Sequence, residues 1–119
     1  AEHARRRHAE LSDGQRALLV LYTIKHLMAS FASLLMFDEP DNFLAHREIQ
    51  PWLSGVRDSM SASGTLLVIS HHPEVIDYLA PDEIWRLRRL DEGPSRLDRI
   101  EFDLAEGLTA SEALKLESQ

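Results

Sequence analysis

Two adjacent carboxylates, Asp38 and Glu39, stand where an apolar run ends and a proline begins, in the segment SLLMFDEP of residues 33–40. Carboxylate oxygens bind Mg²⁺, and a carboxylate can accept a proton from an attacking water. The apolar run is typical of a parallel strand buried on both faces, and open α/β sheets bind ligands at the carboxyl ends of such strands. Acids also follow strands in ordinary turns, so the pair alone leaves both interpretations open.

A second apolar run, TLLVIS at residues 65–70, ends in His71-His72-Pro73. Two continuous apolar strands with a helix between them predict a parallel crossover connection. Such neighbours would bring Asp38, Glu39 and His71 to one edge of the sheet. There they could hold a hydrated Mg²⁺, orient a water and contact a phosphate. The adjacent histidines alone are a weak metal site, because neighbouring side chains point in different directions.

The segment LSDGQ of residues 11–15 predicts the start of a long helix. Ser12 and Gln15 form a capping box, in which each side chain reaches a free backbone N–H. A helix N-terminus that carries Ser12 and Gly14 is also able to bind phosphate. Spacing alone favours the simpler interpretation, a well-capped helix that packs on a core.

The remaining elements follow from apolar periodicity and from the prolines. The first helix carries an apolar stripe that we expect to be buried, widened by Leu18, Leu19 and Tyr22, so that the helix is covered on more than one side. That stripe comprises Ala17, Val20, Leu21, Ile24, Leu27, Met28 and Phe31. Because Pro51 fits best in a first turn, we expect a second helix to begin near residues 48–50. Its buried stripe comprises Ile49, Trp52, Leu53, Val56 and Met60.

The C-terminal third predicts a short helix from Pro73 and strands at residues 83–90 and 97–102 that form a hairpin at the sheet edge. Thr109 and Glu112 form a second capping box, which starts a last short helix. Five arginines fall on the hairpin, and a solvated, charge-protected edge explains them better than a nucleic-acid patch. They are Arg86, Arg88, Arg89, Arg96 and Arg99. The whole pattern predicts one α/β domain.

Composition narrows the classes of function. The 119 residues carry 13 basic and 20 acidic side chains, a net charge of −7, which argues against a chain whose main task is to grip nucleic acid. The absence of cysteine excludes disulfide scaffolds and cysteine-based metal sites. No apolar run approaches the roughly 18 residues of a membrane span, so a cytoplasmic protein is the expectation. Residues 1–10 are polar and lack an initiating Met, as expected of a cut or inserted segment.

Three segments in this order and spacing resemble the C-terminal half of an ABC-type ATPase domain, a partial P-loop NTPase lobe with parallel strands, flanking helices and a C-terminal edge hairpin. Residues 11–15 look like the signature motif, with Asp13 in place of the commoner first glycine. Residues 34–39 look like Walker B, and Ser70-His71 looks like the switch-histidine motif. The resemblance covers residues 10–90, and assigns residues 11–103 to the lobe and 104–119 to a short helix and polar tail.

Within the class, the segments DEPDNFL and SHHP are more similar to the SMC-like and OLD-like AAA ATPase branch than to a transporter. Ala45 stands where transporters carry the D-loop aspartate, so D-loop contacts across a dimer are not implied.

The resemblance implies a role for each matching residue. Asp38 would hold Mg²⁺ through a water, and Glu39 would be the general base that polarises the attacking water. His71 would contact the γ-phosphate of ATP. Three signature residues would act in trans on ATP bound to a partner subunit, in a dimer that closes around two ATP molecules. These are Ser12, Gly14 and Gln15.

The phosphate cradle of such an ATPase is missing from the sequence. No Gly-x-x-x-x-Gly-Lys-Ser/Thr segment is present, and the only lysines, Lys25 and Lys115, lie outside glycine-rich loops. A Walker A half must therefore come from residues outside this sequence or from another chain. Alone, the chain is expected to bind ATP poorly and to be inactive. DNA or a nuclease could be a further partner, and the task that ATP hydrolysis drives stays open.

Two other classes of function remain. A non-catalytic interaction module would keep the fold and regulate a partner, whereas the intact Glu39 and His71 favour catalysis. A metal-dependent hydrolase on another parallel sheet would use the same acids. That alternative gives no account of residues 11–15, and no Gly-x-Ser-x-Gly nucleophile elbow is present.

Overall fold

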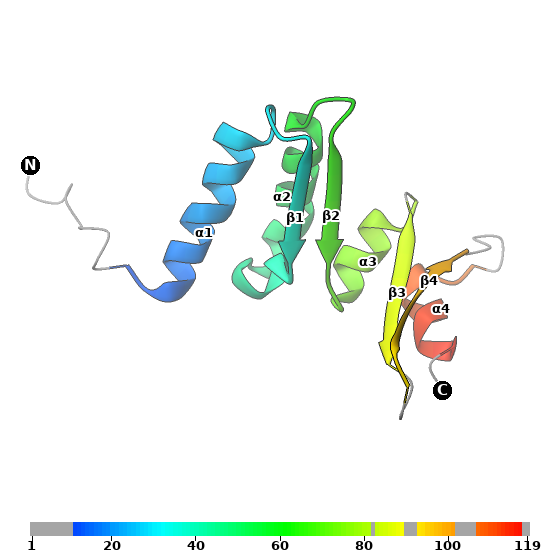
Figure 1. Cartoon of the computed structure of the whole chain (residues 1–119). Helices are drawn as coiled ribbons and strands as arrows, with labels where there is room; N and C mark the ends of the chain where they lie inside the picture. The colour runs from blue at the N-terminus through cyan, green and yellow to red at the C-terminus, as the bar shows by residue number, and fades with distance from the viewer. Residues whose placement is uncertain (1–10, 82, 90–92, 102–106, 118–119) are drawn as a thin grey trace, which may run out of the picture. The chain divides into compact units, whose positions relative to one another are not determined.

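A computed structural model describes residues 11–81, 83–89, 93–101 and 107–117 (Figure 1). The described chain divides into two compact units, one that ends at Ser70 and one that starts at His71. The predicted lead-in at residues 1–10 lies outside the described residues. In the described part of the chain, no helix is both long and apolar enough to cross a membrane.

The first unit is built on two parallel strands, as the sequence predicts. Strand β1 (Leu34–Asp38) pairs with β2 (Thr65–Ile69), with Leu34 opposite Thr65 and Asp38 opposite Ile69. Helix α2 (His46–Ser59) connects them, after a short 3-10 turn, η3 (Pro40–Phe43). The predicted α/β class is therefore confirmed.

Helix α2 supplies most of the core of this unit. It runs behind the β1–β2 sheet in Figure 1, and its buried stripe contains Ile49, Trp52, Leu53 and Val56. The Trp52 ring meets Phe37 of β1 edge-on, with ring centroids 4.9 Å apart. Its indole Nε1–H donates to the backbone oxygen of Leu21 at 3.4 Å, so one side chain joins the sheet, α2 and the first helix. Met60 of the predicted stripe is only half-buried.

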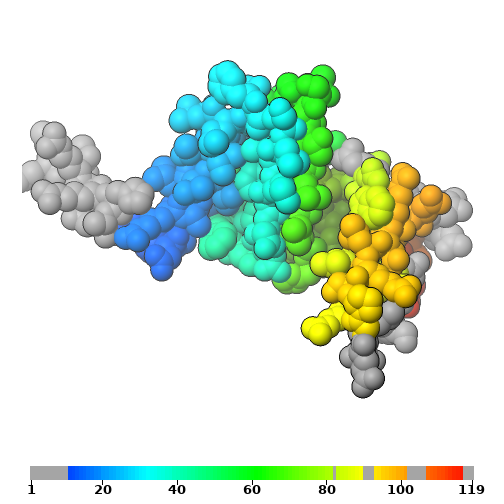
Figure 2. Space-filling view, viewed as in Figure 1, coloured from blue at the N-terminus to red at the C-terminus, as the bar shows by residue number. Residues whose placement is uncertain are grey.

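The predicted burial of both faces of the strands is wrong. Burial alternates along β1: Leu35 and Phe37 pack on α2, whereas Leu34 is 53% and Met36 60% exposed. Leu67 and Ile69 of β2 lie on the same open face. Figure 2 shows this face of β1 and β2 turned to the viewer. No other described element of the first unit covers this apolar face, which a parallel sheet normally buries.

The first helix begins as predicted but does not bury its stripe. Helix α1 (Asp13–Thr23) continues as a stretch of π-helix, η2 (Ile24–Met28). Leu21 and Ala29 are buried, but apolar side chains on the same stripe are half or more exposed. These are Val20, Leu27, Met28 and Phe31. The prediction of a helix covered on more than one side is wrong, because the described chain packs against one side only.

The start of α2 also differs from the prediction. The helix begins at His46, so Pro51 lies inside it rather than in its first turn. The Glu48 carboxylate accepts a hydrogen bond from the backbone N–H of Ala45 at 3.2 Å, which stabilises a start two residues earlier. Pro51 lacks only the N–H that would bond to the preceding turn, and its side chain is exposed.

The second unit contains α3 (Pro73–Leu79), an antiparallel hairpin of β3 (Ile84–Arg89) and β4 (Ser95–Ile100), and α4 (Ala110–Glu117). The short helix, the hairpin and the capping box at Thr109 are confirmed. The hairpin forms a sheet of its own and is not the edge of the β1–β2 sheet, which corrects the prediction. Buried Ser111 joins α4 to α3, since its N–H and Oγ both donate to Asp77 at 2.8 Å.

Candidate functional site

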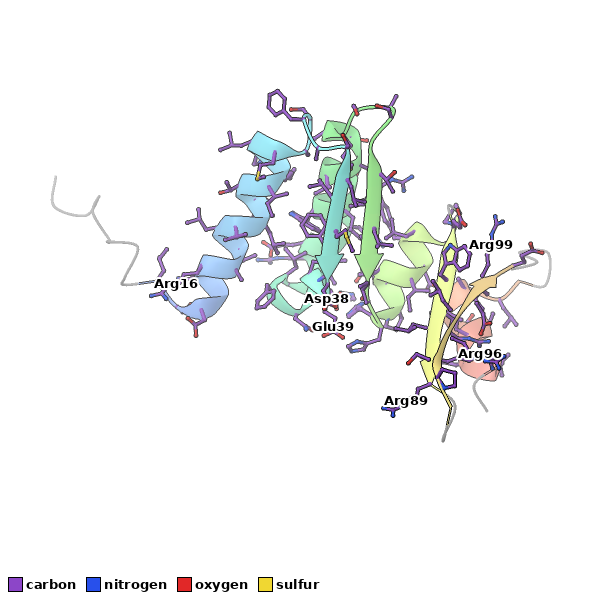
Figure 3. The ribbon with its side chains drawn as sticks, in the orientation of Figure 1. Arg16, Asp38, Glu39, Arg89, Arg96 and Arg99 are labelled. Atoms are coloured by element: carbon purple, nitrogen blue, oxygen red, sulfur yellow. The ribbon has the colours of Figure 1, made fainter. Side chains whose placement is uncertain are left out.

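The acid pair lies at the carboxyl end of β1, where the sequence places it. Asp38 is the last residue of the strand and Glu39 the first beyond it (Figure 3). The Glu39 N–H donates to the backbone oxygen of Ile69 at 2.7 Å, which extends the β1–β2 ladder past the end of the strand. The backbone that carries the two side chains is therefore anchored to the end of β2.

Asp38 ends β1 as an exposed carboxylate. Its side chain is exposed, and it has no hydrogen-bond or ion-pair partner among the residues that the structure describes. No group of three or more His, Cys, Asp or Glu in the described ranges converges as a metal cage. A single carboxylate suits Mg²⁺, which keeps several waters and takes its other ligands from substrate phosphates.

Glu39 has a backbone conformation that is uncommon for a residue with a side chain. Its φ of 48° and ψ of 50° lie in the left-handed region, and it is the only non-glycine residue with positive φ in the described segments. Its carboxylate accepts from the Asn42 side-chain amide at 3.0 Å, and its carbonyl accepts from the Asn42 N–H at 3.1 Å. Such conformations persist only where surrounding contacts over-determine them, and they cluster at functional sites.

The structure adds two residues that sequence reasoning did not place in a site, Asp41 and Ser70. Asp41 is only 8% exposed, and the Ser70 hydroxyl donates to its Oδ1 at 2.7 Å. In the sequence analysis Asp41 appeared only within the segment DEPDNFL, and Ser70 only as the residue before His71. The signal that could have identified the pair is topological: Ser70 follows the strand that lies next to β1.

The two histidines separate into different roles. His72 is the N-cap of α3, where its Nδ1 accepts from the backbone N–H of Glu74 at 3.3 Å. His71 is exposed and directly follows Ser70 in the chain. His71 is also the first residue of the second unit, and each unit is described by itself. The parallel register brings Asp38, Glu39 and Ser70 to one edge of the sheet.

The segment that looks like a signature motif forms an exposed helix N-terminus. The Ser12 Oγ accepts from the Gln15 N–H at 3.2 Å, and the Ser12 N–H donates to Gln15 Oε1 at 3.0 Å, so the predicted capping box is confirmed. A Cβ added to Gly14 would meet nothing within 4 Å. Packing inside the chain therefore gives no reason for a glycine at this position.

Hydrogen bonds from the Thr109 backbone N–H and hydroxyl lower the pKa of the Glu112 carboxyl, in the capping box of α4. That carboxylate stabilises a helix start and has no place in the candidate site.

Comparison with protein-family models found no match, and comparison with curated proteins found no significant match.

Proposed function

We propose that this chain is the C-terminal part of an ABC-type ATPase of the SMC-like or OLD-like AAA branch, which binds ATP and hydrolyses it with Mg²⁺. The observation that carries the proposal is the pairing of β1 with β2. It puts the acid pair Asp38-Glu39 beside the strand that leads into Ser70-His71. The motifs that support the resemblance thus follow neighbouring strands.

The open face of the β1–β2 sheet supports the idea that another lobe completes the domain. Parallel sheets in α/β proteins are covered on both faces, and a two-stranded sheet alone is marginally stable. The sheet has an apolar surface that no other described element of the first unit covers, formed by Leu34, Met36, Leu67 and Ile69. A Walker A half, from outside this sequence or from another chain, would supply the cover and the missing phosphate cradle.

The roles proposed for the residues come from the resemblance, and their positions in the structure are compatible with them. Asp38, exposed and unpartnered within the described residues, would hold Mg²⁺ through a water. Bound Mg²⁺ would neutralise the charge on the ATP phosphates. Glu39, whose carboxylate the Asn42 amide orients, would polarise the attacking water as a general base. His71 would contact the γ-phosphate.

Residues 12–15 would act on ATP bound to a partner subunit. The positive end of a helix attracts phosphate. The open space around Gly14 allows a close approach by a second molecule, in agreement with a role in trans. The working state would be a dimer around two ATP molecules.

Substitution of the proposed base tests the function. In the complete ATPase, Glu39→Gln keeps the size and the hydrogen-bond acceptor but removes the base, so ATP should stay bound and turnover should fall by about 10²- to 10⁴-fold. Single-turnover assays with labelled ATP measure both quantities. Unchanged turnover would refute the proposal and favour a non-catalytic interaction module.

The chain alone offers a second test. Because it lacks a phosphate cradle, titration calorimetry with Mg-ATP should detect weak binding or none. Submicromolar affinity would mean that a complete nucleotide site exists within these residues, and the proposal of a missing half would fail.

A further inference from the structure

Asp41 is a buried carboxylate that the mechanism proposed above does not use. It is 8% exposed, whereas Asp38 is exposed and Glu39 half-buried. Burial of a carboxylate is unfavourable unless hydrogen bonds compensate for the lost water. The Ser70 Oγ donates such a bond at 2.7 Å, a normal length for an O–H···O hydrogen bond. The interaction therefore gives a buried charge its compensation at this position.

The bond spans the two strand ends that carry the candidate site. Asp41 lies two residues after Glu39, in η3, and Ser70 lies one residue before His71. Between them, the Glu39 N–H donates to the Ile69 oxygen at 2.7 Å. Loss of the Asp41–Ser70 bond would let η3 move relative to β2, and Glu39 lies on the segment that would move.

The backbone of Glu39 needs such support. Its left-handed conformation is unfavourable for a residue with a Cβ, so the flanking structure must hold it in place. Asn42 contributes from the same turn, since its side-chain amide donates to Glu39 Oε2 at 3.0 Å. Anchoring of Asp41 to Ser70 keeps this turn, and Asn42 with it, against the end of β2.

We infer that Asp41 and Ser70 are positioning residues: their hydrogen bond clamps η3 to the end of β2 and thereby fixes Glu39 for its role as a base. The inference rests on the proposed function, which supplies the role of Glu39. The clamp is a property of this chain alone. In this role the two residues act through Glu39.

The clamp is measurable in the isolated chain by amide hydrogen exchange. Asp41→Ala and Ser70→Ala should each speed exchange of the Glu39 N–H by about 10- to 100-fold, the range expected for loss of a hydrogen bond to a charged group. Asp41→Asn and Ser70→Thr keep an acceptor and a donor, so they should restore most of the protection. The double alanine variant should exchange no faster than either single variant, because both remove one bond.

The chain contains a matched control pair, Ser54 and Asp58. This pair lies exposed on α2, with the same two side-chain types 3.5 Å apart. Ser54→Ala and Asp58→Ala should leave Glu39 exchange unchanged.

The complete ATPase tests whether the clamp matters for catalysis. Asp41→Ala and Ser70→Ala should lower kcat by about 100-fold, as misplacement of a reacting group does, with little change in the KM for Mg-ATP. Asp41→Asn and Ser70→Thr should restore kcat. A purely structural role would instead reduce the amount of folded enzyme and leave kcat per folded molecule unchanged.

The exchange and kcat measurements distinguish failure of the Asp41–Ser70 clamp from failure of the proposed ATPase function. Unchanged Glu39 exchange in both alanine variants would overturn the inference, and so would faster exchange with a normal kcat. If exchange responds as expected but the complete wild-type protein does not hydrolyse ATP, the proposed function fails, while the clamp itself is established.

Discussion

Replacement of Glu39 by glycine should stabilise the isolated chain relative to replacement by alanine. Both variants lose the carboxylate and its hydrogen bond from Asn42, so the comparison isolates the backbone. Alanine keeps a Cβ at φ 48° and ψ 50°, and glycine adopts these angles without a steric penalty. The pair therefore measures the strain that the native residue stores at the end of β1.

Two opposing effects set the size of the stability difference between Glu39→Gly and Glu39→Ala. The left-handed conformation costs a residue with a Cβ roughly 1–2 kcal/mol. Glycine gives the unfolded chain extra freedom, which lowers stability by about 0.4–1 kcal/mol. We expect Glu39→Gly to be more stable than Glu39→Ala by about 0.5–1 kcal/mol.

Urea denaturation followed by circular dichroism provides the assay, with equal m-values required for the comparison. In thermal unfolding, the same difference should raise Tm by about 2–5 °C. Asp38 supplies the matched control, because it lies one residue earlier in a regular strand. There Asp38→Gly should be less stable than Asp38→Ala, since glycine weakens a strand.

A Glu39→Gly variant that is no more stable than Glu39→Ala would refute the reasoning. The reasoning would also be refuted if the stability difference between the glycine and alanine variants had the same sign at positions 38 and 39. In the complete ATPase proposed above, Glu39→Gly should still lose hydrolysis, so stability and activity should change in opposite directions.

Three further predictions concern other parts of the chain. Gly14→Ala should raise the unfolding free energy of the isolated chain by up to about 1 kcal/mol in urea denaturation, because the added Cβ meets nothing within 4 Å and alanine favours helix. In the proposed complete ATPase, the same change should weaken ATP-dependent dimerisation, which light scattering measures. Trp52→Ala should lower the unfolding free energy by about 3–5 kcal/mol, because Trp52 is buried in the core. Trp85→Ala should lower it far less, because Trp85 is half-exposed. Equal losses in denaturant titrations would contradict this packing of the core. Because the pKa of Glu112 is lowered in the folded state, its contribution to stability is present above the unfolded-state pKa and is lost as pH falls through the folded-state pKa. Glu112→Gln should therefore make stability depend less on pH in this acidic range. An unchanged pH dependence would argue against the hydrogen bond from Thr109.

Local chemistry made several elements predictable from sequence. The capping boxes at Ser12 and Thr109 are encoded by side chains three residues apart, and both form as expected. Pro73 starts α3 because proline suits a first helical turn. The apolar runs predicted β1 and β2, and their parallel pairing followed from the helix between them.

Burial was less predictable, because it depends on what covers a surface. The apolar run of β1 suggested two covered faces, yet Met36 is 60% exposed while Phe37 packs on Trp52. The predicted burial of the stripe on α1 and η2 was wrong for the same reason, and Phe31 is 86% exposed. Periodicity records the faces that a sequence is suited to bury, and it does not identify the molecule that buries them.

The sequence by itself determined the order of the motifs, the helix caps, and the position of Asp38 and Glu39 at a strand end. These depend on neighbours within a few residues, so side-chain type and spacing specify them. Tertiary structure alone decided that Glu39 adopts a left-handed conformation, and that buried Asp41 bonds to Ser70, 29 residues away in the chain. Both features arise where two strands align, and that alignment depends on the packing of α2 and the register of the sheet.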